Sequence, residues 1–118
     1  MNGIINVYKE KGFTSHDVVA KLRGILHMKK IGHTGTLDPD AVGVLPVCLG
    51  KGTGLVSMIT DWTKTYEAVM LLGTTTDTQD TSGNVLTKSV VDVDERTVLE
   101  YAASLKESTN RFHRCIRH

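Results

Sequence analysis

The stretch GHTGTLDPDAVGVLPVCLGKGT, residues 32–53, holds both prolines of the 118-residue chain and places a carboxylate, Asp38, directly before Pro39. A residue that precedes proline is driven from helical toward extended geometry, and flanking glycines permit turns. The sequence therefore predicts that a shaped loop over residues 32–43 presents the Asp38 side chain. Two interpretations stay open from these residues alone: a carboxylate that meets a substrate, or an Asx-turn in which Asp38 caps its own loop.

Hydrophobic spacing predicts the elements on both sides of this loop. Capping-box patterns, Thr14 with Asp17 and Asp92 with Glu95, mark the starts of two helices. The strand that contains Pro46 is expected to lie at an edge of the sheet or to be irregular, because proline has no N–H to donate. The predicted strands are residues 3–8, 44–49, 65–73 and 84–91, the predicted helices are residues 15–27 and 93–106, and residues 54–62 form one or two helical turns.

This mixture of helices and strands predicts the α+β class, with a mixed sheet and flanking helices. The segments 65–72 and 84–91 are expected to pair as a hairpin around the polar turn 74–83. The length fits one domain. No apolar run approaches a membrane span and the N-terminus lacks the layout of a signal peptide, so we expect no membrane association and cytoplasmic residence.

Cysteine and histidine usage does not predict a disulfide framework or a metal site. The chain has two cysteines, and neither has the Cys/His spacing of a zinc site. Cys48 lies in an apolar stretch and is expected to be a buried free thiol. The segment Gly50-Lys51-Gly52-Thr53 approaches a phosphate-binding loop but fails the required glycine and lysine spacing.

Charge is distributed unevenly along the chain. Residues 1–70 carry eight Lys and Arg against six Asp and Glu, whereas residues 71–107 carry three against seven. The last eleven residues carry three arginines and no acid, and 108–118 therefore forms an atypical basic tail. The basic residues near the loop are either a solvated surface or a rim that faces phosphates.

The loop stretch resembles the active-site motif of the bacterial tRNA pseudouridine synthase B (TruB) family. Three further stretches resemble that family in order and spacing: GIINVYKEKGFTSHDVVAKLR (3–23), KTYEA (64–68) and LLGTTTDTQDTSG (71–83). Four motifs in register, over roughly residues 2–90, are far more specific than any one of them. The resemblance implies a partial pseudouridine synthase catalytic domain.

The resemblance also implies a reaction, the isomerisation of a uridine in the T-loop of tRNA to pseudouridine, with no cofactor and no metal. Asp38 matches the catalytic aspartate of the family. Tyr66 matches the tyrosine that stacks on the target base, and His33 matches the histidine that enters the opened T-loop. The chemistry leaves the role of Asp38 open between a nucleophile toward C1′ or C6 and a base that starts elimination at the sugar.

The implied partner is the T-stem-loop of tRNA, whose target uridine must leave its stack to reach the site. Affinity is then expected to come from lysines that contact the RNA backbone. The candidates are Lys9, Lys11, Lys29, Lys30 and Lys64.

The chain is shorter than the catalytic domain that the resemblance implies, so we expect residues 1–107 to be its N-terminal portion. Strand edges without neighbours would then favour self-association. Two alternatives remain open: an RNA-binding fragment without catalysis of its own, and the related synthase subunit that depends on a guide RNA. Turnover separates the first alternative from the leading one, and modification without a guide separates the second.

Overall fold

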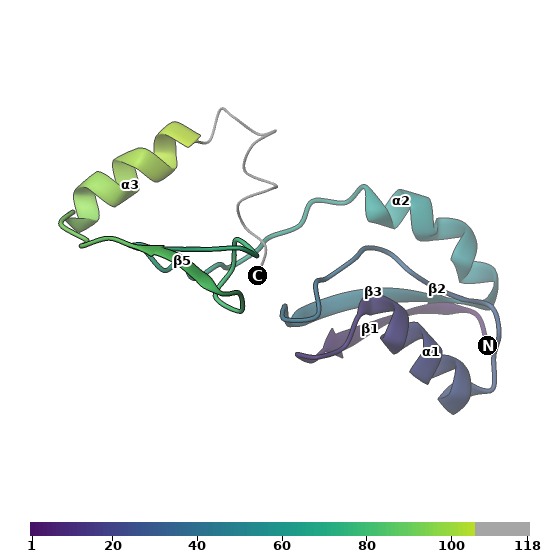
Figure 1. Ribbon diagram of the computed structural model, residues 1–118. Coiled ribbons are helices and arrows are strands. Elements are labelled where there is room, and N and C mark those ends of the chain that lie inside the picture. The colour runs from purple at the N-terminus through teal and green to yellow at the C-terminus, as the bar shows by residue number, and fades with distance from the viewer. Residues whose placement is uncertain (106–118) are drawn as a thin grey trace. The chain divides into compact units, whose positions relative to one another are not determined.

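The computed structural model describes residues 1–105, and the predicted tail lies outside them. The chain divides into two compact units, residues 1–65 and the residues from 66 onward. The first unit contains a three-stranded sheet and the second a two-stranded sheet, and both contain helices (Figure 1). This architecture confirms the α+β class. The predicted division after residue 107 falls outside the described residues and stays a prediction.

The sheet of the first unit contains β1 (Gly3–Lys9), β3 (Gly43–Leu49) and β2 (Ile31–His33) in the order β1-β3-β2, with both pairings antiparallel. The prediction of strand 3–8 is confirmed. The short strand β2 overlaps the first two residues of the stretch 32–43 predicted as loop, and that prediction is wrong there. The strand predicted over 44–49 is confirmed as β3. Of the two alternatives expected for it, an edge or an irregular position, the edge position is wrong, because β3 lies between the other two strands.

The position of β2 explains how a central strand accommodates Pro46. The Thr34 N–H donates to the Pro46 carbonyl oxygen at 3.1 Å, one residue beyond the end of β2. A hydrogen-bonded antiparallel pair exchanges two such bonds, and proline lacks the N–H for the reverse bond. The ladder between β2 and β3 therefore ends at this pair, and the missing donor leaves only one bond unmade.

The first helix, α1 (Ser15–Leu26), confirms the predicted helix and its capping box. The Thr14 hydroxyl oxygen accepts from the Asp17 N–H at 3.0 Å, and the Asp17 carboxylate accepts from the Thr14 N–H at 2.9 Å. This second bond lowers the pKa of Asp17. The helix ends at His27, which adopts the left-handed conformation with φ 50°.

The core of the first unit lies between α1 and one face of the sheet. Val18 and Val19 of α1 are buried together with strand residues, which are Ile31, Leu45, Val47 and Leu49. The 3-10 helix η1 (Gly50–Leu55) and α2 (Val56–Thr60) confirm the predicted helical turns, and α2 lies on the opposite side of the sheet (Figure 1).

Cys48 is fully buried, which confirms the prediction of a buried free thiol. Successive strand residues face opposite sides of a sheet, so Cys48 faces away from the side that Val47 and Leu49 share with α1. Burial raises the pKa of the Cys48 thiol, so the group is an inert core residue rather than a reactive thiolate.

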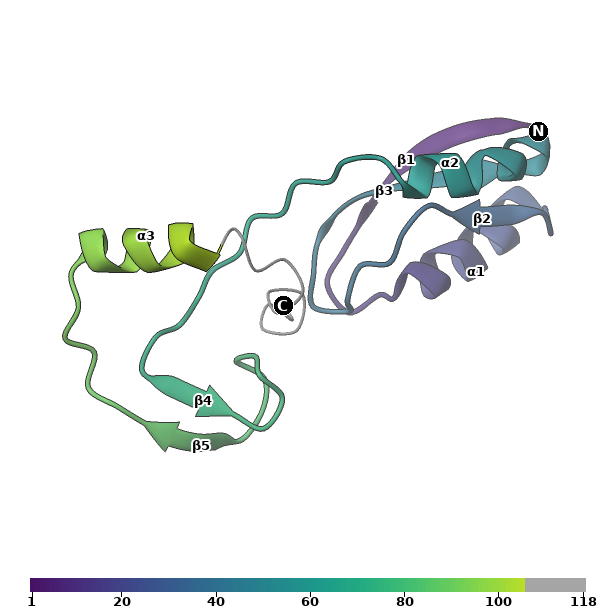
Figure 2. The same ribbon diagram turned by 90° about the horizontal axis from the view of Figure 1, so that it is seen from above.

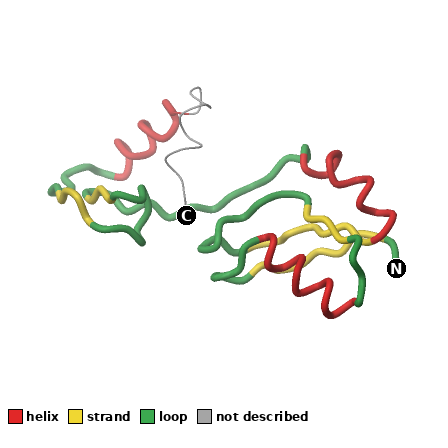
Figure 3. The backbone as a smooth tube through the Cα atoms, turned by 45° about the vertical axis from the view of Figure 1, so that its right-hand side comes forward, coloured by secondary structure: helices red, strands yellow, loops and turns green. Residues whose placement is uncertain are grey.

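The second unit contains β4 (Thr74–Thr76), β5 (Val85–Lys88) and α3 (Glu95–Ser104). The prediction of a strand over 65–73 is wrong, because this segment contains no helix or strand (Figure 3). The partner of β5 is therefore β4, with Thr74 opposite Lys88, and the predicted hairpin with 65–72 is wrong as well. A strand needs a neighbouring strand to form hydrogen bonds with its backbone N–H and C=O groups. No described strand pairs with the apolar segment 65–73.

The prediction of helix 93–106 is confirmed in its central part by α3. The predicted N-cap, Asp92, lies two residues before the observed one. The N-cap is Asp94, whose carboxylate accepts from the Thr97 N–H at 2.8 Å. Hydrogen bonds from the side chain and backbone of Thr97 lower the pKa of Asp94. The extended backbone at Asp94 (φ −84°, ψ 165°) places the turn into the helix here rather than at Asp92.

Candidate functional site

The loop that carries Asp38 lies at the end of the first sheet where β1 ends and the chain turns toward α1 (Figure 2). The Asp38 side chain is exposed. The backbone oxygen of Asp38 accepts from the Ala41 N–H at 3.0 Å, which closes a turn. Across residues 1–105, no hydrogen bond or ion pair engages its carboxylate. The Asx-turn alternative is therefore wrong, and the carboxylate is available to a ligand.

Both backbone neighbours of Asp38 are held in place. On one side, the Leu37 N–H donates to the Ser15 hydroxyl oxygen at 2.9 Å. On the other side, the Pro39 carbonyl oxygen accepts from the Gly12 N–H at 2.8 Å. The side chain thus projects from a fixed stretch of backbone. No local pattern in the sequence indicates this contact between Ser15 and a residue 22 positions away.

Lys9 is buried beneath this loop and not on the surface. The residue is 1% exposed. Its ammonium group donates to three backbone carbonyl oxygens, those of Phe13 at 2.6 Å, Glu10 at 3.1 Å and Pro39 at 3.4 Å. The prediction that Lys9 contacts the RNA backbone is contradicted by this burial, because an ammonium group with these partners cannot reach a phosphate. Lys9 instead joins the turn before α1 to the loop of Asp38.

The segment from β2 to the loop contains His33, the last residue of that strand. Its Nδ1 lies 2.6 Å from the Gly35 carbonyl oxygen. A carbonyl oxygen only accepts, so Nδ1 is the donor in this contact. Next to it, buried Thr34 donates from its hydroxyl to the Pro46 carbonyl oxygen at 2.9 Å. The ring of His33 is thus oriented by its own loop.

The remaining candidate lysines differ in their surroundings. Lys11, Lys29 and Lys30 are exposed. The Lys64 ammonium group donates to the Thr60 carbonyl oxygen at 2.5 Å and to the Trp62 carbonyl oxygen at 3.2 Å, at the end of α2. Its Cε lies beside Gly35, where an added Cβ would be 3.6 Å away. Of these four, Lys64 is the one that the structure places against the loop.

Tyr66 is the first residue of the second unit and is 58% exposed. The expected stacking of Tyr66 on the target base stays a prediction. Asp38, His33 and Lys64 all belong to the first unit.

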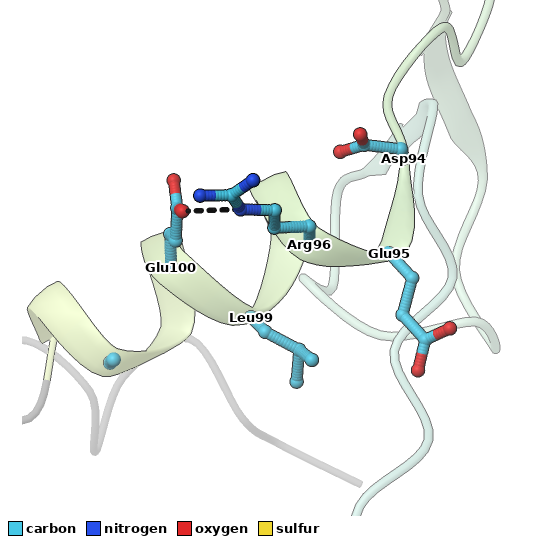
Figure 4. Close-up of a pocket in the computed structure, with 6 residues that line it drawn as sticks. Asp94, Glu95, Arg96, Leu99 and Glu100 are labelled. Atoms are coloured by element: carbon cyan, nitrogen blue, oxygen red, sulfur yellow. Dashed lines mark hydrogen bonds and ion pairs between the residues drawn. The ribbon is translucent and has the colours of Figure 1, made fainter.

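A shallow pocket in the second unit is lined by none of the predicted site residues. Its lining belongs to α3 and its cap (Figure 4). The Arg96 guanidinium donates to the Glu100 carboxylate at 3.1 Å along one side of the helix, and Leu99 points away from this pair in the same view. An exposed ion pair of this kind contributes little to stability. We assign the pocket no role.

The part of the chain that the structure describes contains no group of three His, Cys, Asp or Glu side chains arranged to hold a metal ion. Its helices are all too short or too polar to cross a membrane.

Comparisons of the sequence with protein families and with curated proteins point to the same family. Residues 23–112 match the family model described as TruB family pseudouridylate synthase (N terminal domain). A protein of Lachnoclostridium phytofermentans named tRNA pseudouridine synthase B is 75% identical over 73 residues, which are 62% of this chain and 24% of the relative. A protein of Streptococcus pneumoniae with the same name is 55% identical over 107 residues, 89% of this chain and 37% of the relative.

A solved structure of an H/ACA RNP bound to a substrate RNA containing 2'-deoxyuridine includes a similar chain. That chain is 54% identical with a TM-score of 0.46, over 48% of this chain and 18% of its own length. The matched segments thus span between about a quarter and about a third of the two curated relatives, 24% and 37% of their lengths.

Proposed function

Because this chain belongs to the TruB family of pseudouridylate synthases, we propose that it provides the catalytic aspartate for converting a uridine in the T-loop of tRNA to pseudouridine. The observation that carries the proposal is the state of Asp38. Its carboxylate is exposed and without a partner within residues 1–105, while hydrogen bonds hold the backbone on both sides. A reactive side chain needs this combination of a fixed backbone and a terminal group that is open to the substrate.

The proposed reaction conserves every atom of the uridine. The bond from N1 of uracil to C1′ of the sugar breaks, the base turns, and a bond from C5 to C1′ forms. A proton leaves C5 and a proton is added at N1, so no oxidant, reductant or co-substrate enters. Asp38 acts either as a nucleophile toward C1′ or C6, or as a base at the sugar.

Two further residues are proposed to receive the RNA. His33 enters the opened T-loop with its ring already oriented through the bond to Gly35. Tyr66 stacks on the target base, a contact worth about 1–3 kcal/mol per base. This stacking offsets part of the cost of moving the base out of its stack in the T-loop.

Phosphate contacts are proposed for the exposed lysines Lys11, Lys29 and Lys30, and for Lys64 beside the loop. Such contacts release counterions, and the affinity for RNA should fall steeply as the salt concentration rises. A tRNA substrate also suits residence in the cytoplasm.

Unguided modification of a bare T-stem-loop tests the proposal against its two alternatives. The chain is incubated with the stem-loop RNA alone, and pseudouridine is quantified by nuclease digestion and chromatography. A stem-loop with cytidine at the target position serves as the control. Product from the first RNA supports the proposed function. Salt-sensitive binding without product favours an RNA-binding fragment, and product only after addition of a guide RNA favours the guide-dependent subunit.

A further inference from the structure

The contact between the start of α1 and the loop of Asp38 contains a buried hydroxyl group. Ser15 is the first residue of α1 and is 1% exposed. Its Oγ accepts from the Leu37 N–H at 2.9 Å, and Leu37 directly precedes Asp38 in the chain. A serine side chain thus holds the peptide group next to the residue that is proposed to react.

We propose that Ser15 is a positioning residue for Asp38, an inference that rests on the proposed function. The Leu37 N–H is fixed by Ser15, and the Pro39 carbonyl oxygen is fixed from the other side by the Gly12 N–H at 2.8 Å. With both neighbours held, the carboxylate moves by rotation of its own side chain. Loss of the Ser15 hydroxyl frees one side and lets the backbone of Asp38 shift.

Helix capping does not account for the Ser15 hydroxyl. The cap of α1 is complete without it, because Thr14 and Asp17 satisfy each other's backbone N–H groups. The Ser15 Oγ instead bonds to a residue 22 positions away, in the loop. Adjacent hydroxyl residues therefore have separate roles: Thr14 starts the helix, and Ser15 holds the loop.

Positioning of this kind affects the rate more than binding. Catalysis requires reacting atoms about 3–3.5 Å apart, and a misplacement of about 1 Å costs on the order of 100-fold in rate. The Ser15→Ala variant is therefore expected to lower kcat by about 10- to 100-fold. KM should change little, because no RNA contact is assigned to Ser15.

The experiment compares the wild-type chain with Ser15→Ala and with a matched control, Thr53→Val. The Thr53 hydroxyl also bonds to a backbone group, here by donating to the Gly50 carbonyl oxygen at 2.8 Å, but it lies in η1 outside the loop. Each variant removes one hydroxyl group that bonds to the backbone. The measurements are Tm, kcat and KM for tritium release from tRNA that carries 5-tritiated uridine, and amide hydrogen exchange by NMR at Leu37 and Ala41.

In Ser15→Ala, exchange at Leu37 should accelerate about ten-fold, which corresponds to one lost hydrogen bond. Exchange at Ala41, whose N–H bonds to the Asp38 carbonyl oxygen, should rise as well. Thr53→Val should lower Tm to a similar degree and leave both amides and kcat unchanged.

Unchanged exchange at Leu37 and Ala41 in Ser15→Ala would overturn the proposal, and so would equal losses of kcat in the two variants. Failure of the proposed function is seen separately, because the wild-type chain would then release no tritium. The two exchange rates would still decide whether Ser15 holds the loop of Asp38.

Discussion

At the scale of single residues, the site depends on which polar groups are engaged and which are free. Asp38 has no partner within the described residues, whereas its surroundings are fully bonded: Lys9 donates to three carbonyl oxygens and Ser15 accepts from Leu37. Buried groups with complete hydrogen bonding resist displacement because an unpaired partner is costly. The polar atoms beneath the loop thereby hold the backbone that carries the Asp38 carboxylate in one place.

The burial of Lys9 leads to a prediction about stability. Lys9→Met removes a donor from three carbonyl oxygens and should lower the free energy of unfolding by about 2–3 kcal/mol, the order expected for buried bonds to a charged group. The exposed neighbour Lys11 is the matched control, and Lys11→Met should leave the stability almost unchanged. Urea denaturation of both variants gives the comparison. Equal stability of the two variants would show that Lys9 does not hold the loop.

The capping box of α1 leads to a prediction about pH. The Thr14 N–H bonds to the Asp17 carboxylate and lowers its pKa in the folded state, whereas the unfolded value is about 3.9. The stabilisation is therefore complete above about pH 5 and is lost as the pH falls through the folded pKa. The difference in Tm between the wild-type chain and Asp17→Asn should shrink between about pH 5 and pH 2.

Thermal unfolding at several pH values measures this difference, with Asp40→Asn as a control on an exposed turn. A Tm difference that stays constant for Asp17→Asn across this range would contradict the assigned role of the capping carboxylate.

At the scale of elements, the sequence predicted those helices and strands whose hydrophobic pattern and caps lie within the element itself. The strand β1 and the helix α1 carry their own periodicity and cap, and both were predicted. The strand β2 is only three residues long and exists through its pairing with β3. The apolar run over 65–73 has the composition of a strand but no neighbouring strand among the described residues, and so it does not form one.

The candidate site was predictable to a similar extent. The motif around Asp38 identified the carboxylate and its loop. The groups that hold this loop come from the end of β1 and the start of α1, and their hydrogen bonds span 22 positions for Ser15 and 30 for Lys9. No local pattern encodes such contacts, and Lys9 was for this reason misassigned to the surface.

The element η1 packs so closely on β1 that one of its glycines cannot be replaced. A Cβ at Gly52 would lie 2.5 Å from the Gly3 carbonyl oxygen, whereas a Cβ at Gly54 would meet nothing within 4 Å. Gly52→Ala should therefore destabilise the chain by about 1–3 kcal/mol, as overpacking does. Gly54→Ala should be neutral or stabilise by about 0.4–1 kcal/mol. Chemical denaturation of the two variants provides the test, and equal effects would contradict the packing.

At the scale of the whole molecule, the two units differ in their cores. The first unit buries a cluster of apolar side chains between α1 and the sheet. None of residues 66–105 is buried, and their exposed side chains include Val69 (96%), Val90 (94%) and Met70 (68%). Hydrophobic burial is the main stabilising contribution to folding, so the second unit has little stability of its own.

This exposed apolar surface predicts self-association of the chain. Size-exclusion chromatography from about 1 to 500 μM should show an apparent mass that rises with concentration, because association follows mass action. Replacing Val69 and Met70 with glutamate should reduce the effect. A constant monomeric mass over this range would contradict the prediction.

The central claim is that Asp38 reacts with the target uridine, and tritium release from tRNA that carries 5-tritiated uridine tests it most directly. Formation of the bond from C5 to C1′ expels the label, so release reports the chemical step. The wild-type chain is compared with Asp38→Asn and with the nearby exposed control Asp40→Asn. We predict that Asp38→Asn lowers the rate by at least about 100-fold while Asp40→Asn retains it. Equal release by the two variants would contradict the assignment of Asp38.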